Sequence, residues 1–181
     1  MAEKKSGISY EQIIKDLKAR KFAPVYVLMG DESFYIDKIC DFISENVLKP
    51  EEQDFNQTVV FGADVNAMQV VDMCKGYPMM AEYRVVVVKE AQNLRNLEPL
   101  EKNILNPVKT TILVLCHKNG SIDRRKKFIP QAEKVGVVFE SKKLYDRQLP
   151  GVIETYLQSR KSTIEPKATQ MIADHIRAGL H

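Results

Sequence analysis

Five short segments of consecutive apolar, mostly β-branched residues recur along the chain. Their side chains are apolar at successive positions rather than at alternate ones, which indicates that both faces of each segment are buried. Strands of this kind are typical of parallel sheets, because crossover connections cover both faces of such a sheet. The predicted strands are residues 25–29, 58–61, 84–89, 110–116 and 137–140.

Segments with apolar residues at helical spacing lie between these strands. Ser9 and Gln12 have the spacing of a capping box, which predicts a helix that begins there and ends before Pro24. Asp64 is the predicted N-cap of a later helix, and Pro130 falls inside another. Strands that alternate with helices favour a three-layer α/β fold with a parallel sheet and right-handed crossovers. The other predicted helices are residues 33–48, a helix after Asp64 that carries Val65, Met68, Val71 and Met73, residues 94–105 and residues 123–134.

The pattern changes after residue 141, where strands give way to helices alone. Residues 149–159 and 166–177 are predicted helices, and no further strand follows them. We therefore expect three parts: an N-terminal tail and helix in residues 1–20, an α/β domain in residues 21–141, and a partial all-helical domain in residues 142–181. The chain ends shortly after an apolar helix, so this last domain is predicted to be cut short.

Composition and charge argue against several classes of protein, such as membrane proteins and strongly basic nucleic-acid binders. The chain has 181 residues, with 27 Lys and Arg against 24 Asp and Glu, which gives a formal net charge of +3. This length can bury a sizeable core, and the charge is too mild for nucleic-acid binding by bulk electrostatics alone. The first seven residues lack the apolar stretch of a signal peptide, and no apolar run approaches the roughly 20 residues that cross a bilayer. We expect a cytoplasmic protein without membrane association.

The cysteines and histidines indicate neither a metal site nor a disulfide framework. No two cysteines form a C-x-x-C pair, and no histidine has a metal-ligand spacing to a cysteine or to another histidine. Each cysteine has apolar neighbours, which is typical of a small buried side chain in a reducing compartment. We expect no metal and no cofactor. The residues concerned are Cys40, Cys74, Cys116, His117, His175 and His181.

The loop after the first predicted strand is where an α/β domain would hold a phosphate, against a helix N-terminus. A phosphate-binding loop has the pattern G-x-x-x-x-G-K-[ST]. Counted from Gly30, the second glycine is replaced by Tyr35, the lysine by Ile36 and the serine or threonine by Asp37. Asp31 and Glu32 also put two negative charges in this loop. The sequence therefore predicts a degenerate nucleotide site that does not bind nucleotide.

The end of the third predicted strand supports the same interpretation. P-loop ATPases end a strand of this kind with an acidic residue that holds Mg²⁺, whereas this chain has Lys89 followed by Glu90. Two weaker alternatives remain open: Glu90 as a general base, and a metal ion shared by Asp31, Glu32 and Glu90. Cys74 has no plausible base beside it in the sequence. Cys116 and His117 are adjacent on a predicted strand, which points their side chains to opposite faces, so we expect no catalysis by this chain alone.

The segment from Lys75 to Arg84 combines apolar side chains with helix-stopping residues. Gly76 is predicted to end the preceding helix, and the residues that follow form a short irregular element before a strand. One interpretation, which the sequence alone favours, is that these side chains cover the rim of the sheet. The other is that they anchor a partner protein, since methionine is frequent at adaptable binding surfaces. The four candidate residues are Tyr77, Pro78, Met79 and Met80.

A run of four basic residues lies at the start of the last predicted helix of the α/β domain. It could contact a nucleic-acid backbone or an acidic partner, or it could be a solvated helix face, which the sequence favours. Aromatic residues that would stack on bases are not interleaved with it. The run consists of Arg124, Arg125, Lys126 and Lys127.

These motifs together resemble a known family. Residues 24–34 are similar to the P-V-Y-L-L-x-G-E-E-x-F opening of the delta subunit of the bacterial DNA polymerase III clamp loader. Residues 78–88 are similar to its small–apolar–F–x–E–R–R–L–V–V–V segment, although Met80 stands where many members have an aromatic residue. Residues 123–128 match a D-x-R-x-K-apolar helix start, and Leu149-Pro150 with residues 164–168 matches the entry to its lid domain. The resemblance spans about residues 20 to 176.

The resemblance implies a fold and a mechanical function. The family has an AAA+-like domain with a five-stranded parallel sheet, a small helical lid and a helical collar that joins the ATP-hydrolysing clamp-loader subunits. Its members lack a working nucleotide site, bind the ring-shaped sliding clamp and stabilise an opened interface. By position the clamp contact falls on Met79 and Met80, flanked by Tyr77 and Pro78. DNA is a partner in the assembled complex, and the subunit belongs to a DNA-directed DNA polymerase holoenzyme.

The sequence departs from the pattern of this family in two respects, and two alternative functions remain open. Residues 176–181 do not follow the usual continuation of the family, and the collar is absent from the sequence, so we expect no assembly into a loader pentamer. One alternative function is a P-loop-like nucleotide-binding enzyme with an atypical site. The other is a module that contacts DNA without reading its sequence.

Overall fold

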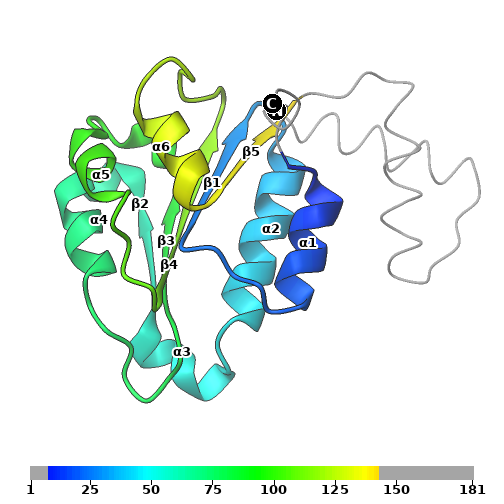
Figure 1. Cartoon of the computed structure of the whole chain (residues 1–181), viewed down its shortest axis with the longest axis vertical. Coiled ribbons are helices and arrows are strands. Elements are labelled where there is room, and N and C mark those ends of the chain that lie inside the picture. Colours follow the sequence, from blue (N-terminus) through cyan, green and yellow to red (C-terminus); the bar gives the residue numbers. More distant parts are fainter. Residues whose placement is uncertain (1–7, 143–181) are drawn as a thin grey trace, which may run out of the picture. The chain divides into compact units, whose positions relative to one another are not determined.

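The computed structural model describes residues 8–142, which form one α/β unit (Figure 1). None of the helices in this part of the chain has the length and apolar character needed to cross a bilayer. The elements in chain order are α1 (Tyr10–Lys18), β1 (Val25–Gly30), α2 (Ser33–Asn46), α3 (Pro50–Asn56), β2 (Gln57–Phe61), the 3₁₀ turn η2 (Gly62–Asp64), α4 (Ala67–Cys74), β3 (Arg84–Lys89), the 3₁₀ turn η3 (Ala91–Asn93), α5 (Glu98–Asn103), β4 (Thr111–Lys118), α6 (Phe128–Val135) and β5 (Val137–Ser141).

The five strands form one sheet in the order β2-β3-β4-β1-β5, and every neighbouring pair is parallel. Helices α1 and α2 cover one face of the sheet, and α4, α5 and α6 cover the other (Figure 1). The three-layer arrangement and all five predicted strands are confirmed. Because the strands are parallel, the connections that follow them lie at one edge of the sheet and the connections that precede them lie at the opposite edge.

The core consists of one apolar cluster on each face of the sheet. All six residues of β1 are buried, and its five apolar residues before Gly30 alternate between the two clusters. Val27 and Met29 belong to the cluster under α4 to α6, whereas Tyr26 and Leu28 belong to the cluster under α1 and α2. Full burial of one such side chain contributes about 1.5–3 kcal/mol. The consecutive apolar pattern therefore reflects a sheet that is covered on both faces.

Two helices begin differently from the sequence prediction. Ser9 caps α1 as predicted, because its hydroxyl accepts the backbone N–H of Gln12 at 3.1 Å. The prediction that Asp64 caps the later helix is wrong, because Asp64 lies in η2 and α4 begins after Asn66. Asn66 and Gln69 form a reciprocal capping box with distances of 2.8 and 2.9 Å, which satisfies two backbone donors at once.

The predicted helix at residues 123–134 is shorter than expected and begins at Phe128. Asp123 accepts the backbone N–H of Arg125 at 2.9 Å, and this local bond favours a turn over a helix. With the later start, Pro130 falls in the first helical turn, where a backbone N–H has no intrahelical partner in any case.

Two further differences concern short elements. The sequence prediction missed α3, and it made one helix of residues 94–105 where the structure has only α5, Glu98–Asn103. The predicted helices at residues 149–159 and 166–177 lie outside the described residues, so the helical domain and the domain boundaries stay predictions.

We predict that Gly30→Ala destabilises the protein by about 2–4 kcal/mol, because two penalties combine at this position. Gly30 has a φ of +134°, and a Cβ there would lie 1.9 Å from the carbonyl oxygen of Ser141. Gly120→Ala is the control, since Gly120 has a φ of +122° but no atom within 4 Å of an added Cβ. It should lose only the part due to backbone strain, about 1–2 kcal/mol, and therefore less than Gly30→Ala. Equal losses in urea unfolding would contradict the close approach of β1 to the end of β5.

Candidate functional site

The connection from β1 to α2 is a two-residue turn. β1 ends at Gly30 and α2 begins at Ser33, which leaves only Asp31 and Glu32 between them. The backbone N–H of Glu32 donates to the carbonyl oxygen of Ser141 at 3.3 Å, which holds the turn against β5. A phosphate-binding loop is longer, because its backbone must wrap around the phosphate before the helix starts.

The carboxylate of Glu32 occupies the N-terminus of α2. Its side chain is 1% exposed, and one carboxylate oxygen accepts the backbone N–H of Phe34 at 2.5 Å. An anion is stabilised at this end of a helix by the free N–H groups and the helix dipole. Here that anion is a side chain of the protein itself, at the end of the helix where a bound phosphate would lie.

The residues that replace the phosphate-binding pattern have structural roles. Ile36 is fully buried in the core cluster under α1 and α2. The ring of Tyr35 packs on Tyr10 at 4.6 Å between centroids, and burial first, then the charge of Glu11, raises the pKa of Tyr35 to about 12. Asp37 forms an ion pair of 2.7 Å with Lys118, at the end of β4.

Polar side chains connect the ends of β3 and β4 at the same edge of the sheet. Gln92 donates to the carboxylate of Glu90 at 2.6 Å and accepts the backbone N–H of Lys118 at 2.9 Å. Burial disfavours the charged form of Lys118, but the hydrogen bond and charge of Asp37 outweigh it and raise the pKa of Lys118. Lys89 is exposed. Thus the structure links Asp37 to Glu90 through Lys118 and Gln92.

A metal site is not assembled at this edge in the described part of the chain. Across residues 8–142, no three His, Cys, Asp or Glu side chains are grouped closely enough to hold a metal ion. Glu32, one member of the alternative with Asp31 and Glu90, is instead turned onto the N-terminus of α2.

The segment between α4 and β3 lies at the opposite edge of the sheet, beside α3 (Figure 1). α4 ends at Cys74, and the N–H of Gly76 donates to the carbonyl oxygen of Met73 at 3.4 Å. The guanidinium of Arg84 donates to the same carbonyl at 3.0 Å. These bonds end the helix as predicted and fix the start of the segment. We call residues 77–80 the docking turn.

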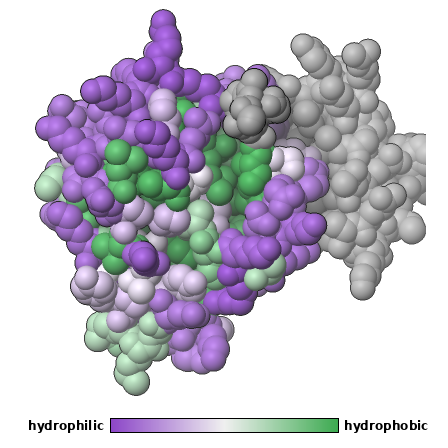
Figure 2. Space-filling view, in the orientation of Figure 1, coloured by the Kyte–Doolittle hydropathy of each residue, from purple (hydrophilic) through white to green (hydrophobic). Residues whose placement is uncertain are grey.

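Three of the four side chains of the docking turn are exposed, and Pro78 is half-buried. Tyr77 is 73% exposed, Met79 is 60% exposed and Met80 is 99% exposed. The interpretation that they cover the rim of the sheet is therefore wrong. Figure 2 shows pale green, hydrophobic atoms gathered at the end of the molecule where α3 and this turn lie. Exposed apolar side chains that cluster in this way mark interaction sites on soluble proteins.

Sequence reasoning missed the contribution of α3 to this end of the molecule. Asn56, the last residue of α3, is buried and bonds to the backbone of Met79. Its neighbour Phe55 is 67% exposed. Helix α3 has a polar sequence, and its contact with the docking turn joins residues 23 positions apart, so no local pattern could reveal it.

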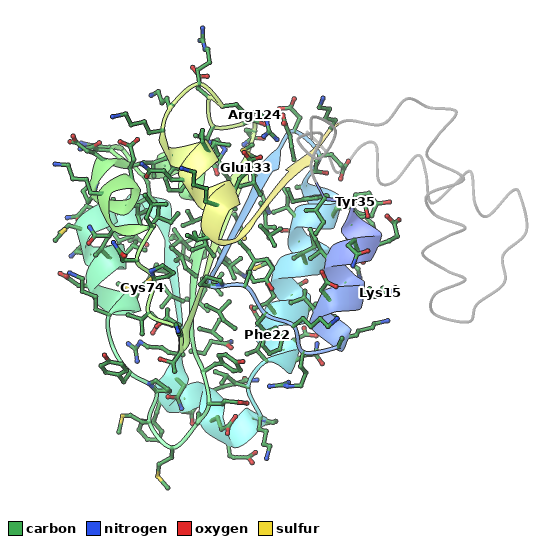
Figure 3. The ribbon with its side chains drawn as sticks, viewed as in Figure 1. Lys15, Phe22, Tyr35, Cys74, Arg124 and Glu133 are labelled. Carbon is green, nitrogen blue, oxygen red and sulfur yellow. The ribbon has the colours of Figure 1, made fainter. Side chains whose placement is uncertain are left out.

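The basic run lies in the turn before α6, so the expectation that it forms a helix face is wrong. Arg124 pairs with Glu133 at 3.3 Å, and both residues are labelled in Figure 3. Arg124 also pairs with Glu140 at 3.1 Å. Arg125 pairs with Asp123 at 3.0 Å, and this hydrogen bond lowers the pKa of Asp123. Nearby carboxylates therefore balance two of the four cations. The other two are Lys126 and Lys127.

The strand order and the two helical layers define an AAA+-like α/β domain, and known proteins share it. A solved structure of the Bacillus subtilis DNA clamp loader delta protein matches with a TM-score of 0.76 and 23% sequence identity, over 95% of this chain and 57% of that one. Residues 26–142 match the family described as DNA polymerase III, delta subunit. The chain belongs to this family, so the resemblance and the AAA+-like fold that it implied are confirmed.

A curated relative is consistent with this assignment. The DNA polymerase III subunit delta of Bacillus subtilis (strain 168) is 26% identical over 166 residues, which cover 86% of this chain and 48% of the relative. The chain spans about half the length of the relatives that it matches.

His117 gives a pH-dependent test of the C-terminal edge of the sheet. Its Nδ1 atom lies 3.1 Å from the carbonyl oxygen of Gly120, and burial lowers the pKa of His117 below its ordinary value of 6.5. Below pH 6.5 the unfolded chain therefore binds more protons at this position than the folded chain. The free energy of unfolding should fall as the pH drops from 7.5 through 6.5 toward the folded-state pKa.

The His117→Asn variant should lose this part of the acid-side slope, since its amide can donate to Gly120 without titrating. The chain has two other histidines, His175 and His181, so the test is the difference between the two proteins in urea unfolding at each pH. Parallel curves for the variant and the wild type would contradict the burial of a neutral His117.

Proposed function

We propose that this chain is the clamp-binding part of a clamp-loader delta subunit, which binds the ring-shaped sliding clamp and stabilises its opened interface during DNA replication. The observation that carries the proposal is the docking turn, where Met79 and Met80 stand in solvent on an ordered backbone. An exposed apolar pair of this kind can enter a pocket of a partner without first leaving the core of its own domain. Tyr77 and Pro78 would flank the pair at the edge of the pocket.

The size of the apolar contribution indicates what else the interface needs. Full burial of two methionine side chains contributes about 3–6 kcal/mol. Micromolar affinity corresponds to about 8 kcal/mol, before the entropic cost of association is considered. The methionines alone are therefore too weak, and we expect Tyr77 and neighbouring polar groups to contribute the rest.

Clamp opening then follows from differential binding. A ligand shifts a closed ring toward an open one only by the ratio of its affinities for the two states. In this proposal the docking turn anchors the domain to the clamp, and the remainder of the domain prevents the ring interface from closing flat. No catalysis by this chain is required.

We further propose that this domain does not bind or hydrolyse ATP. The support is the side chains that take the place of a phosphate-binding loop: Glu32 at the N-terminus of α2, Ile36 in the core, and the Asp37–Lys118 ion pair. Nucleotide hydrolysis would belong to other clamp-loader subunits, joined through a collar domain like that of the family. These partners, the DNA held by the assembled loader and a cytoplasmic location are parts of the same proposal.

The two alternative functions have less support. A nucleotide-binding enzyme would need room for phosphate at the start of α2, where Glu32 lies. A DNA-contacting module would need uncompensated cations, whereas Arg124 and Arg125 are paired with carboxylates.

We predict that the chain binds the sliding clamp of its own organism with micromolar or tighter affinity, and that Met79→Ala combined with Met80→Gly weakens binding at least about 30-fold. Glycine is chosen because Met80 has a φ of 55°, so this substitution removes the side chain and relieves backbone strain. Thermal stability should therefore not fall at this position. Isothermal titration calorimetry measures the affinity.

Met68→Ala is the matched control, because Met68 is 48% exposed on α4 and lies outside the docking turn. It should bind like the wild type. If the double variant binds as tightly as the wild type, the clamp contact lies elsewhere on the molecule. If the folded wild type does not bind, the proposed function is wrong.

For the nucleotide site we expect no saturable binding of Mg²⁺–ATP at concentrations up to about 1 mM, a typical upper limit for substrate affinities. The physical reason is that a carboxylate at the N-terminus of α2 repels the phosphates. The measurement is titration of ATP into the purified chain, followed by thermal shift. A saturable rise in melting temperature would overturn this part of the proposal.

A further inference from the structure

The docking turn has very few ties to the rest of the domain. Within residues 8–142, the hydrogen bonds to the backbone of residues 77–83 all come from one side chain, Asn56. On one side of the turn, the helix end at Gly76 is fixed by Met73. On the other side, the ring of Tyr83 packs edge-on against Phe22 at 5.2 Å between centroids. Ala81, directly after the docking turn, packs against the core cluster under α1 and α2. Between Gly76 and Ala81, the hydrogen bonds that position the backbone of the described chain come from Asn56.

Asn56 bonds to both backbone groups of Met79. Its Oδ1 atom accepts the Met79 N–H at 2.6 Å, and its Nδ2 group donates to the Met79 carbonyl oxygen at 3.0 Å. The same Nδ2 group donates to the carbonyl oxygen of Glu52 at 2.9 Å, one helical turn earlier. Both amide hydrogens and the amide oxygen are therefore used. At 1% exposure the side chain is shielded from water, which would otherwise compete for these bonds.

The backbone that Asn56 holds would not keep this conformation without support. Met80 follows the fixed residue directly and has a φ of 55°, a left-handed conformation that costs a non-glycine residue about 1–2 kcal/mol. Its side chain is 99% exposed, so no packing compensates for that cost. The two bonds at Met79 therefore stabilise a strained turn that presents Met80 to solvent.

We infer that Asn56 is a positioning residue that holds the docking turn in its binding conformation before the partner arrives. The inference rests on the proposed function, because it assigns to Asn56 the preorganisation of the clamp contact. A turn that is already ordered avoids the entropic cost of ordering a loop on association. If only a fraction of the molecules had the competent turn, the apparent affinity would fall by that fraction.

Asn56→Ala tests this inference through association and dissociation rates with the sliding clamp. The variant should slow association about tenfold or more and change dissociation less, because the turn must first find its conformation. Asn103→Ala is the matched control, since Asn103 donates to the Pro99 carbonyl oxygen at 2.7 Å, the same bond within a helix, but does not touch the docking turn. It should keep the wild-type rates. A folded Asn56→Ala variant with wild-type rates would overturn the inference and leave the proposed function intact.

Amide hydrogen exchange at Met79 is a second readout, and it needs neither the clamp nor a variant. In the wild-type protein this amide should exchange more slowly than those of Tyr77 and Met80, which have no hydrogen bond among the described residues. Equal exchange at the three amides would overturn the inference even if Asn56→Ala fails to fold. Protection at Met79 in a protein that does not bind the clamp would support the positioning role and contradict the proposed function instead.

Discussion

Parallel pairing of the central strands, with apolar side chains on both faces, is the constraint on which the other features of this domain depend. β1, β3 and β4 are each paired on both sides, and Val27, Val87 and Val114 in their middles are fully buried. This burial fixes the register, because a slip of one residue would exchange the two faces of a strand. The parallel pairing places all connections that follow strands at one edge of the sheet and all connections that precede strands at the opposite edge. The two candidate sites lie on these opposite edges.

The two edges of the sheet differ in which side chains are satisfied by the protein itself and which remain in contact with water. At the edge that follows the strands, the protein satisfies its own charges: Glu32 caps α2, and Lys118 pairs with Asp37. At the other edge, Asn56 uses its hydrogen bonds to hold a turn whose apolar side chains stay in water. The buried carboxylate at the N-terminus of α2 and the exposed apolar turn both support the proposal that this domain works by binding another protein.

The fold could be predicted from the sequence because it follows from local apolar runs, such as residues 85–88. The position of the docking turn could also be predicted from a local pattern, because Gly76 and Pro78 interrupt the helix. The exposure of the turn could not be predicted, because the burial of Met79 depends on which distant residues pack against it. The role of Asn56 could not be predicted, because its partner Met79 lies 23 residues away. Helix α6 begins later than the sequence predicted, because the turn at Asp123 competes with the helix.

The most direct test of the account is hydrogen exchange of the chain with and without the sliding clamp of the same organism. The account predicts that the clamp protects backbone amides in residues 77–83 and leaves residues 30–37 and 123–127 unchanged. Protection confined to residues 123–127 would assign the contact to the basic turn instead. Clamp binding without any change in residues 77–83 would contradict the central claim that the docking turn is the clamp-binding surface.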